Sequence, residues 1–372
     1  MMPKRGPLCV GEKVQLTDRK GAMITALLEH GEVVQTQRGV IPHDDVIGLV
    51  EGSIVTTRSA AALHQMQLGQ GAGMAPASTG DDDGSIQDAK KPWKAARRLG
   101  GWSYTVMRPR LADYVLSMPR GAQIMYPKDI AQVLTMGDIR SGMRVLESGA
   151  GSGAMSLNLL DAVGSEGHLT TIERRSEFAR IAGLNASVYF GGMPKRWELL
   201  TGDFDTVAKD CTEHGYDRVV LDMLDPWNRL EAVERLIVPG GVLSAYVTTT
   251  TQMSRLVEQM RERGSWTEPE VSETLQRDWK VQGLAVRPNH QMIGHTGFIV
   301  VSRAMSPGIE ALRKRERATK DTYADIDGAT AAESLEELEL RDISDRKLRK
   351  VLRDLEHQAT VVESGMEQGA LE

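Results

Sequence analysis

The segment RVLESGAGSGAMSLNLLDAVG, residues 144–164, decides the fold that the sequence predicts. Residues 144–148 contain a short apolar run typical of a strand, and residues 154–164 show the spacing of a helix. The loop between them has a glycine at every second position, which permits a tight turn and a close backbone approach to a ligand. Because a helix N-terminus presents unpaired N–H groups, this unit predicts a ligand site at the loop.

Strands and helices alternate from about residue 101 onward. Further strands are expected at 168–173, 197–204, 217–222, 242–249 and 297–303. Helices are expected at 174–190, 228–237 and 251–264. Alternation at this spacing predicts an α/β fold, a Rossmann-like, doubly wound sheet with helices on both faces.

Four regions of the chain differ in composition. Residues 1–62 contain β-rich pieces such as KVQLT and EVVQT, which predict a small N-terminal β domain. Residues 63–100 include a stretch rich in Gly, Ala, Ser and Asp, which predicts a flexible connector. Residues 101–305 carry the alternating pattern and form the expected α/β domain. Residues 306–372 predict a charged tail that is partly helical or disordered.

The distribution of charge matters more than the net charge of −6, which by itself argues against a nucleic-acid partner. Residues 306–372 hold 11 Lys/Arg and 16 Asp/Glu, so most of the negative excess lies in the tail. Residues 90–128 contain nine basic side chains and a single acid, Asp113. A basic stripe of this kind can neutralise phosphates, although a solvated end of a linker has the same composition.

Targeting signals are not evident in the sequence. The longest apolar runs are of strand length, so no membrane span is expected, and the start MMPKRGPLCVGEK lacks the apolar stretch of a signal peptide. The two cysteines, Cys9 and Cys211, lie far apart and form no metal-ligand pattern. We therefore expect a reduced, cytoplasmic protein without a metal site.

The glycine loop has the form Glu147-x-Gly149-x-Gly151-x-Gly153, and Glu173 follows at the end of the next expected strand. A carboxylate at that place can accept two hydrogen bonds from ribose hydroxyl groups. A nicotinamide oxidoreductase would also have an acid there. Its fingerprint is Gly-x-Gly-x-x-Gly, however, and here the third glycine comes one residue early. The pattern instead resembles the first motif of class I S-adenosylmethionine-dependent methyltransferases.

Five separated motifs make the resemblance more specific. They are RPRLADYVLSMPRGAQIMYPKDI, VLESGAGSGAMSL, VVLDMLDPW, VLSAYVTTTTQ and IGHTGFIV. In this order and spacing they resemble the TrmI-type tRNA N1-adenine methyltransferases, which methylate adenosine 58 of the T-loop. The resemblance covers roughly residues 5–60 and 100–304. It implies a homotetramer that binds tRNA and S-adenosylmethionine.

The resemblance also implies which residues form the site. The implied cofactor-binding residues are Glu147, Gly149, Gly151, Ser152, Gly153, Ala154, Met155, Glu173, Phe178, Asp203, Phe204 and Asp222. Glu173 would hold the ribose, and Asp203 would lie near the adenine amine, although Asp203 also fits a plain helix N-cap. The implied catalytic residues are Asp222, Tyr126 and Tyr246, with the two tyrosines bordering the target base. On residue type alone, Tyr126 fits a packed loop anchor and Tyr246 fits the core equally well.

Two aspartates compete for the catalytic position in RVVLDMLDPW, residues 218–227. Asp225-Pro226-Trp227 is half of the Asp-Pro-Pro-Tyr signature of enzymes that methylate exocyclic amines, but Trp227 stands where the second proline belongs. Asp222 ends a strand, where ligands of this fold bind, so we predict Asp222. The remaining alternatives are a methyltransferase for another nucleic-acid adenine or a small molecule, and a non-catalytic RNA-binding module.

Overall fold

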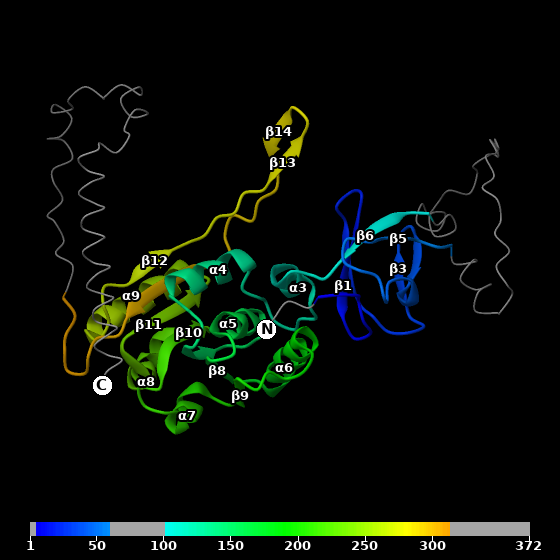
Figure 1. Ribbon diagram of the computed structural model, residues 1–372. Helices are drawn as coiled ribbons and strands as arrows, with labels where there is room; N and C mark the ends of the chain where they lie inside the picture. Colours follow the sequence, from blue (N-terminus) through cyan, green and yellow to red (C-terminus); the bar gives the residue numbers. More distant parts are fainter. Residues whose placement is uncertain (1–4, 60–100, 313–372) are drawn as a thin grey trace, which may run out of the picture. The chain divides into compact units, whose positions relative to one another are not determined.

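The structure is a computed structural model that describes residues 5–59 and 101–312. The predicted connector from residue 63 to 100 and the tail beyond residue 312 lie outside the described residues. The α/β prediction is confirmed, and the expected β-rich N-terminal region is present as well (Figure 1).

The N-terminal region is built from two small antiparallel sheets. One has the strand order β2-β1-β6-β5, and the other pairs β3 with β4. The strands are β1 (Lys13–Asp18), β2 (Met23–Leu27), β3 (Val33–Thr36), β4 (Gly39–Pro42), β5 (Ile54–Thr56) and β6 (Ser103–Met107). Alternate residues of β1, Val14 and Leu16, are fully buried, as period-two patterning requires. Residues 103–107, which follow the expected connector, form β6 and pair with β1 and β5 of the small sheet.

A seven-stranded sheet forms the centre of the α/β region, in the order β12-β15-β11-β10-β7-β8-β9. Its strands are β7 (Arg144–Ser148), β8 (His168–Glu173), β9 (Trp197–Thr201), β10 (Tyr216–Asp222), β11 (Ile237–Val247), β12 (Glu270–Ser272) and β15 (Phe298–Arg303). The five strands from β11 to β9 are parallel, whereas β15 runs antiparallel to both β11 and β12. Strand order reverses between β7 and β10, which is where doubly wound sheets bind their ligands.

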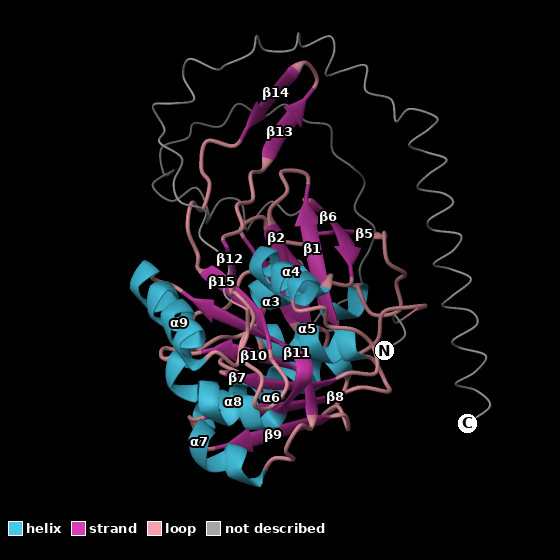
Figure 2. Cartoon of the chain, turned by 90° about the vertical axis from the view of Figure 1, so that its left-hand side faces the viewer, coloured by secondary structure: helices cyan, strands magenta, loops and turns pink. Residues whose placement is uncertain are grey.

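Helices cover both faces of this sheet (Figure 2). They are α3 (Leu111–Ser117), α4 (Pro127–Met136), α5 (Ala154–Val163), α6 (Ser176–Phe190), α7 (Phe204–Val207), α8 (Leu230–Leu236) and α9 (Thr250–Arg263). Buried residues of α3 to α6 form one core with the sheet, and those of α7 to α9 form the other. Three helices, α3, α4 and α7, were not expected, and the strand expected at 197–204 ends at Thr201. Pro127 at the first turn of α4 is a readable start signal.

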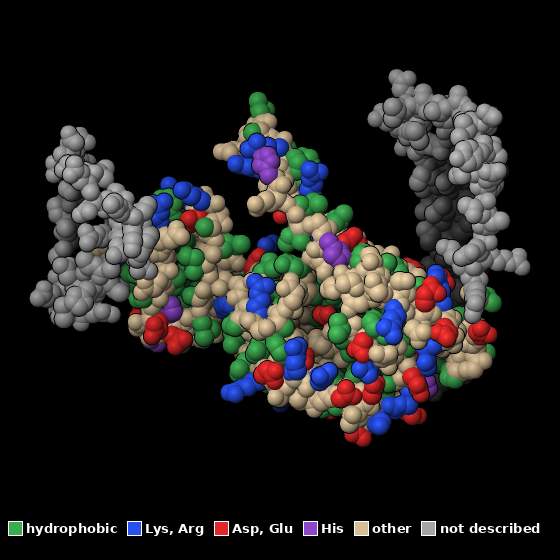
Figure 3. All heavy atoms as spheres, turned by 180° about the vertical axis from the view of Figure 1, so that it is seen from behind, with side chains coloured by type: hydrophobic (Ala, Val, Ile, Leu, Met, Phe, Trp, Pro, Cys, Tyr) green, Lys and Arg blue, Asp and Glu red, His purple; other side chains and the backbone are tan. Residues whose placement is uncertain are grey.

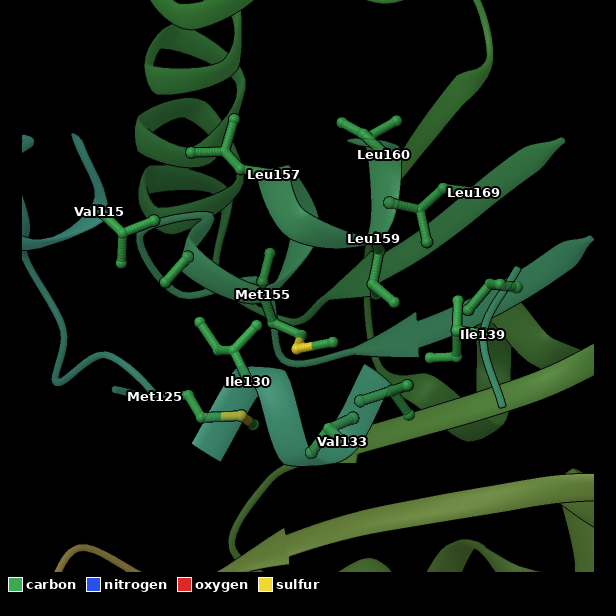
Figure 4. Close-up of a cluster of buried hydrophobic side chains, with 14 of the residues drawn as sticks. Val115, Met125, Ile130, Val133, Ile139, Met155, Leu157, Leu159, Leu160 and Leu169 are labelled. Atoms are coloured by element: carbon green, nitrogen blue, oxygen red, sulfur yellow. The ribbon is translucent and has the colours of Figure 1, made fainter. Parts of the chain in front are cut away.

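Strand β7 shows how the two cores share one sheet. Val145 belongs to the core beneath α3 to α6, and its neighbour Leu146 belongs to the core beneath α7 to α9. Figure 4 shows the first of these cores, in which the side chain of Met155 lies near Ile130 and Val133 of α4. Each fully buried aliphatic side chain of this kind contributes about 1.5–3 kcal/mol to folding. This packing fixes the carboxyl ends of the strands, where the predicted site lies.

A hairpin extends from the α/β region between β12 and β15. Its strands β13 (Trp279–Gln282) and β14 (Ala285–Pro288) form a two-stranded sheet of their own among the described strands. Several apolar side chains on it are exposed, among them Trp279 at 57%, Val281 at 71% and Leu284 at 105%. Lys, Arg and His side chains lie on the same arm (Figure 3). No described helix has the length and apolar character needed to cross a membrane.

Candidate active site

A cavity of about 340 Å³ opens at the carboxyl ends of β7, β8 and β10. Its volume lies within the range of small-ligand pockets, about 300–1,000 Å³. Five of the predicted residues line it, namely Gly149, Glu173, Asp203, Phe204 and Asp222. The other lining residues are Ser148, Ile172, Arg174, Arg175, Gly202, Met223, Leu224, Asp225 and Arg229. The start of the glycine loop, which follows β7, and Asp222, which ends β10, therefore line the same cavity.

Gly149, the first glycine of the loop, packs against the end of β10. Its φ of +96° is unfavourable for other residues, and a Cβ atom there would overlap the carbonyl oxygen of Asp222. The Gly149 N–H donates to the carbonyl oxygen of Ile172 in β8, with a nitrogen–oxygen distance of 3.1 Å that is normal for a backbone hydrogen bond. The loop thus packs backbone to backbone against the strand that carries the predicted catalytic residue.

Glu173 is almost fully buried at the end of β8. One carboxylate oxygen accepts the N–H of Gly151 and the other accepts the N–H of Arg175, each with a nitrogen–oxygen distance of 3.0 Å. A carboxylate has about four acceptor positions, so two remain for hydroxyl groups of a ligand. The residue is therefore held by the glycine loop with acceptor positions open to the cavity.

Glu147 lies beneath the cavity and not in its wall. One of its oxygens accepts hydrogen bonds from the hydroxyl groups of Ser156 (2.6 Å) and Thr171 (2.7 Å), and the residue has no solvent exposure. Burial, with the negative charges of Asp222 and Glu173, raises the pKa of Glu147 to about 7, although the two hydroxyl hydrogen bonds act in the opposite direction. Its other oxygen, Oε1, is buried without a partner among the described residues. Glu147 accordingly supports the loop from below.

Asp222 is half-buried at the end of β10. Burial, and secondarily the negative charge of Glu173, raise the pKa of Asp222 to about 7. A perturbed carboxyl group in a cleft is typical of functional sites. An ionised Asp222 would be strongly attracted to positive charge arising in the cavity.

Asp225 also lines the cavity, but its carboxylate is engaged locally. Its Oδ2 accepts a hydrogen bond from Asn228 (2.9 Å) and one from Arg229 (3.3 Å). Pro226 begins the short 3-10 helix η3 (Pro226–Arg229) directly afterwards. Trp227 packs against the core beneath α7 to α9, with the guanidinium of Arg255 4.7 Å from its ring centre. The Asp-Pro-Trp segment therefore shapes a turn.

The remaining predicted cofactor residues fall into two groups. Asp203 lines the cavity and also caps α7, because its Oδ1 accepts the N–H of Asp205 at 3.1 Å. Both of the interpretations given for Asp203 are thus compatible with the structure. Phe178 does not line the cavity; the guanidinium of Arg175 lies 3.8 Å from its ring centre.

The start of α5 contributes backbone more than side chains. Ala154 and Met155 are buried in the core beneath α3 to α6, so only their backbone groups face the loop. A Cβ at Gly153 would lie 3.2 Å from Cα of Ala182, which explains the glycine there. Ser152 Oγ accepts the N–H groups of Gly121 (3.3 Å) and Ala122 (3.4 Å), so it holds the segment before α4 against the loop.

The two predicted tyrosines lie outside the cavity wall. Tyr126 is half-buried and precedes α4 as its N-cap residue. Tyr246 is 6% exposed and lies beside Asp222, because β10 and β11 pair in a register that places these two residues opposite each other.

Three arginines that line the cavity, Arg174, Arg175 and Arg229, were not predicted from the sequence. The first two directly follow β8, and that position was a readable signal.

A second cavity is larger, about 550 Å³, but is a weaker candidate. It lies between α8, α9 and the segment after β15, away from the glycine loop. Its Glu234 and Arg263 are paired with each other at 2.6 Å, so their charges are already compensated. Within the described ranges, no group of three His, Cys, Asp or Glu residues could hold a metal ion.

Two solved structures share this fold. A SAM-dependent O-methyltransferase from Thermotoga maritima superimposes with a TM-score of 0.65 at 25% identity, covering 83% of this chain and 96% of that chain. TrmI from Aquifex aeolicus superimposes with a TM-score of 0.60 at 24% identity, covering 80% of this chain and 99% of that chain. Sheet order, glycine loop and Glu173 together define a class I S-adenosylmethionine-dependent methyltransferase.

The family follows from the sequence comparisons. The protein family described as "TrmI-like N-terminal" matches residues 6–55. The family described as "tRNA methyltransferase complex GCD14 subunit" matches residues 101–289. The tRNA (adenine(58)-N(1))-methyltransferase TrmI of Thermus thermophilus is 29% identical over 288 residues, 77% of this chain and 95% of the relative. The tRNA (adenine(57)-N(1)/adenine(58)-N(1))-methyltransferase TrmI of Methanocaldococcus jannaschii is 30% identical over 238 residues. That alignment covers 58% of this chain and 84% of the relative. The chain belongs to the TrmI family of tRNA methyltransferases.

Proposed function

We infer that this chain transfers a methyl group from S-adenosylmethionine to N1 of adenosine 58 in tRNA. The observation that carries the inference is the placement of Asp222. In a chain of the TrmI family, a half-buried carboxyl group of raised pKa lies beside the glycine loop at the strand end where ligands of this fold bind.

The cavity fits the cofactor of this enzyme class. Gly149 allows close approach of the loop backbone, Glu173 keeps acceptor positions for ribose hydroxyl groups, and Asp203 has a second oxygen for the adenine amine. We propose that these residues hold S-adenosylmethionine. When bound, it supplies an electrophilic methyl group on a positively charged sulfur.

Asp222 suits the demands of attack by adenine N1. N1 keeps an in-plane lone pair, so no side chain has to remove a proton first. As N1 gains the methyl group, positive charge develops on the purine and spreads to the exocyclic amine. A carboxylate that accepts a hydrogen bond from that amine stabilises the transition state more than the neutral ground state. The same bond orients N1 toward the cofactor.

The test is a product analysis. Purified protein is incubated with unmodified tRNA and labelled methyl donor, and the digested nucleosides are separated by mass spectrometry. We expect 1-methyladenosine from tRNA and none from a matched transcript in which guanosine replaces adenosine 58. Methylation at N6, or methylation only of a small molecule, would contradict the proposed function.

The rate of methyl transfer should depend on pH through Asp222. Its pKa is raised to about 7, so the useful carboxylate form is lost as the pH falls. Single-turnover rates should therefore rise about tenfold per pH unit below the midpoint and level off above it. The bound sulfonium favours the ionised form, so the midpoint is expected at or below pH 7.

Glu147 provides the control for this pH profile, because its pKa is also raised to about 7. The Glu147→Gln variant removes that second titrating group. The midpoint should persist in this variant if Asp222 causes it. A rate that is flat between pH 5.5 and 8, or a midpoint lost in Glu147→Gln, would assign the profile elsewhere.

We further propose that the chain acts in the cytoplasm as a homotetramer. The family resemblance supports this assembly, and so does the arm β13–β14, whose exposed Trp279, Val281 and Leu284 would gain from burial against another subunit. Sedimentation equilibrium measures the mass directly. A monomeric mass at micromolar concentration would contradict the proposal.

A further inference from the structure

A buried ion pair lies at the start of α4, outside the cavity described above. Lys128 Nζ and Asp129 Oδ1 are 2.7 Å apart, with side-chain exposures of 11% and 0%. Burying two charges costs so much desolvation free energy that such a pair is weak evidence for stability. Its place in the fold therefore requires another explanation.

The pair belongs to a closed network of hydrogen bonds. Lys128 Nζ donates to Asp129, to the carbonyl oxygen of Thr274 (2.7 Å) and to the hydroxyl of Thr296 (2.6 Å). The Thr296 hydroxyl in turn donates to the second oxygen of Asp129, at 2.7 Å. All three donors of the ammonium group are thus used, and both carboxylate oxygens are occupied. A network satisfied in this way holds its members in one arrangement.

Tyr246 is in contact with this network. Its hydroxyl group interacts with the side chains of Thr296 and Asp129. Burial, with the negative charges of Asp129 and Asp222, raises its pKa. Gly297, which follows Thr296 in the chain, packs against the same ring; a Cβ there would lie 2.6 Å from the hydroxyl oxygen and 2.7 Å from Cε2. The ring of Tyr246 therefore contacts both the Gly297 backbone and the ion-pair network.

These contacts of Tyr246 with Asp129, Thr296 and Gly297, called the clamp below, lie next to Asp222. Register pairs Asp222 of β10 with Tyr246 of β11, so both side chains project from neighbouring strands on the α4 face of the sheet. None of Lys128, Asp129 and Thr296 lines the cavity of the glycine loop. The network thus lies outside the wall of that cavity.

We propose that Lys128 and Asp129 are positioning residues for the target adenine, which fix the ring of Tyr246 beside Asp222 through the contacts of both Asp129 and Thr296 with that tyrosine. The proposal rests on the proposed function, since the TrmI resemblance behind that function implies that Tyr246 borders the target base. A base that must present N1 in line with a methyl group is sensitive to small displacements of its contacts. An ion pair with saturated hydrogen bonds supplies that rigidity.

The test compares Asp129→Asn, Thr296→Val and Tyr246→Phe. Asp129→Asn should lower the single-turnover rate of methyl transfer roughly 10- to 100-fold, with less than a twofold change in the Kd for S-adenosylmethionine. Thr296→Val keeps the ion pair and should lower the rate less. If Asp129 acts through the Tyr246 hydroxyl, adding Asp129→Asn to Tyr246→Phe should cost little more than Tyr246→Phe alone.

Glu234→Gln is the matched control. Glu234 is another partly buried carboxylate with cationic, hydroxyl and indole partners, in Arg263, Ser265 and Trp266, but it lies away from Asp222. This variant should lower thermal stability and leave the rate per folded molecule unchanged. Equal rate losses in both variants, or fully multiplicative losses in the double variant, would overturn the positioning role.

A readout independent of methylation separates this proposal from the proposed function. With 3-fluorotyrosine at position 246, the ¹⁹F resonance should shift or broaden in Asp129→Asn and stay unchanged in Glu234→Gln. An unchanged resonance in Asp129→Asn would overturn the clamp. If wild-type protein makes no 1-methyladenosine while the resonance responds, the proposed function fails and the clamp of Tyr246 stands without its assigned role.

Discussion

Replacing Asp222 with alanine should lower methyl transfer to tRNA by roughly 100- to 1,000-fold, the usual cost of removing one group that stabilises transition-state charge. The variant loses the half-buried carboxylate that faces the cavity from the end of β10. Within residues 5–59 and 101–312, no hydrogen bond joins this side chain to the glycine loop, and the contact with Gly149 involves the carbonyl oxygen of Asp222. Single-turnover kinetics measure the loss, and calorimetric titration measures binding of S-adenosylmethionine, which should be largely retained.

Asp225→Ala is the matched control, since it removes a second carboxylate from the same cavity wall. Its carboxylate bonds to Asn228 and Arg229 and thereby stabilises the turn. We expect this variant to keep substantial activity. Losses of equal size in Asp222→Ala and Asp225→Ala would contradict the assignment of the catalytic position to Asp222.

Gly149→Ala should abolish cofactor binding and destabilise the fold by a few kcal/mol, among the larger effects of a single substitution. The added methyl group would overlap the carbonyl oxygen of Asp222, and the backbone φ of +96° disfavours any residue with a Cβ. Neither atom can yield without separating β7 from β10. Thermal unfolding and titration with S-adenosylmethionine would measure the two effects.

Gly151→Ala provides the comparison within the same loop. Its φ of +51° lies in the left-handed region, but the nearest atom to an added Cβ is Cβ of Ala122 at 3.7 Å, an ordinary contact. The cost should be only about 1–2 kcal/mol, the strain of the left-handed conformation. Equal destabilisation by the two substitutions would show that backbone strain, and not overlap with Asp222, governs the loop.

Much of the α/β fold could be predicted, because its strands are buried and bounded by clear signals. Strands β7 and β8 occupy the expected residues, 144–148 and 168–173. The membership of β6 could not be predicted, since its local pattern does not tell which sheet it joins. The arm β13–β14 was missed for the opposite reason: its side chains are exposed on both faces, so no core imposes a periodic pattern.

The site was predictable wherever position along a strand decides it. Glu173 and Asp222 end their strands, and both line the cavity. Contacts between distant segments were not predictable, because a sequence pattern carries no partner. Glu147 lies under the loop through its bonds to Ser156 and Thr171, and the role of Lys128 depends on Thr274 and Thr296 far along the chain. Such contacts arise only from tertiary packing.

The contact between Gly149 and Asp222 has a consequence for how the enzyme folds. The two residues are brought together by the pairing of β7 with β10, and the strands β8 and β9 with their helices lie between them in the chain. Parallel pairing of such distant segments requires closure of a long loop, and contacts of this kind form slowly. Helices α5 and α6 can form from local interactions beforehand, whereas the cavity exists only once the centre of the sheet has closed. Binding competence is therefore a late event in folding.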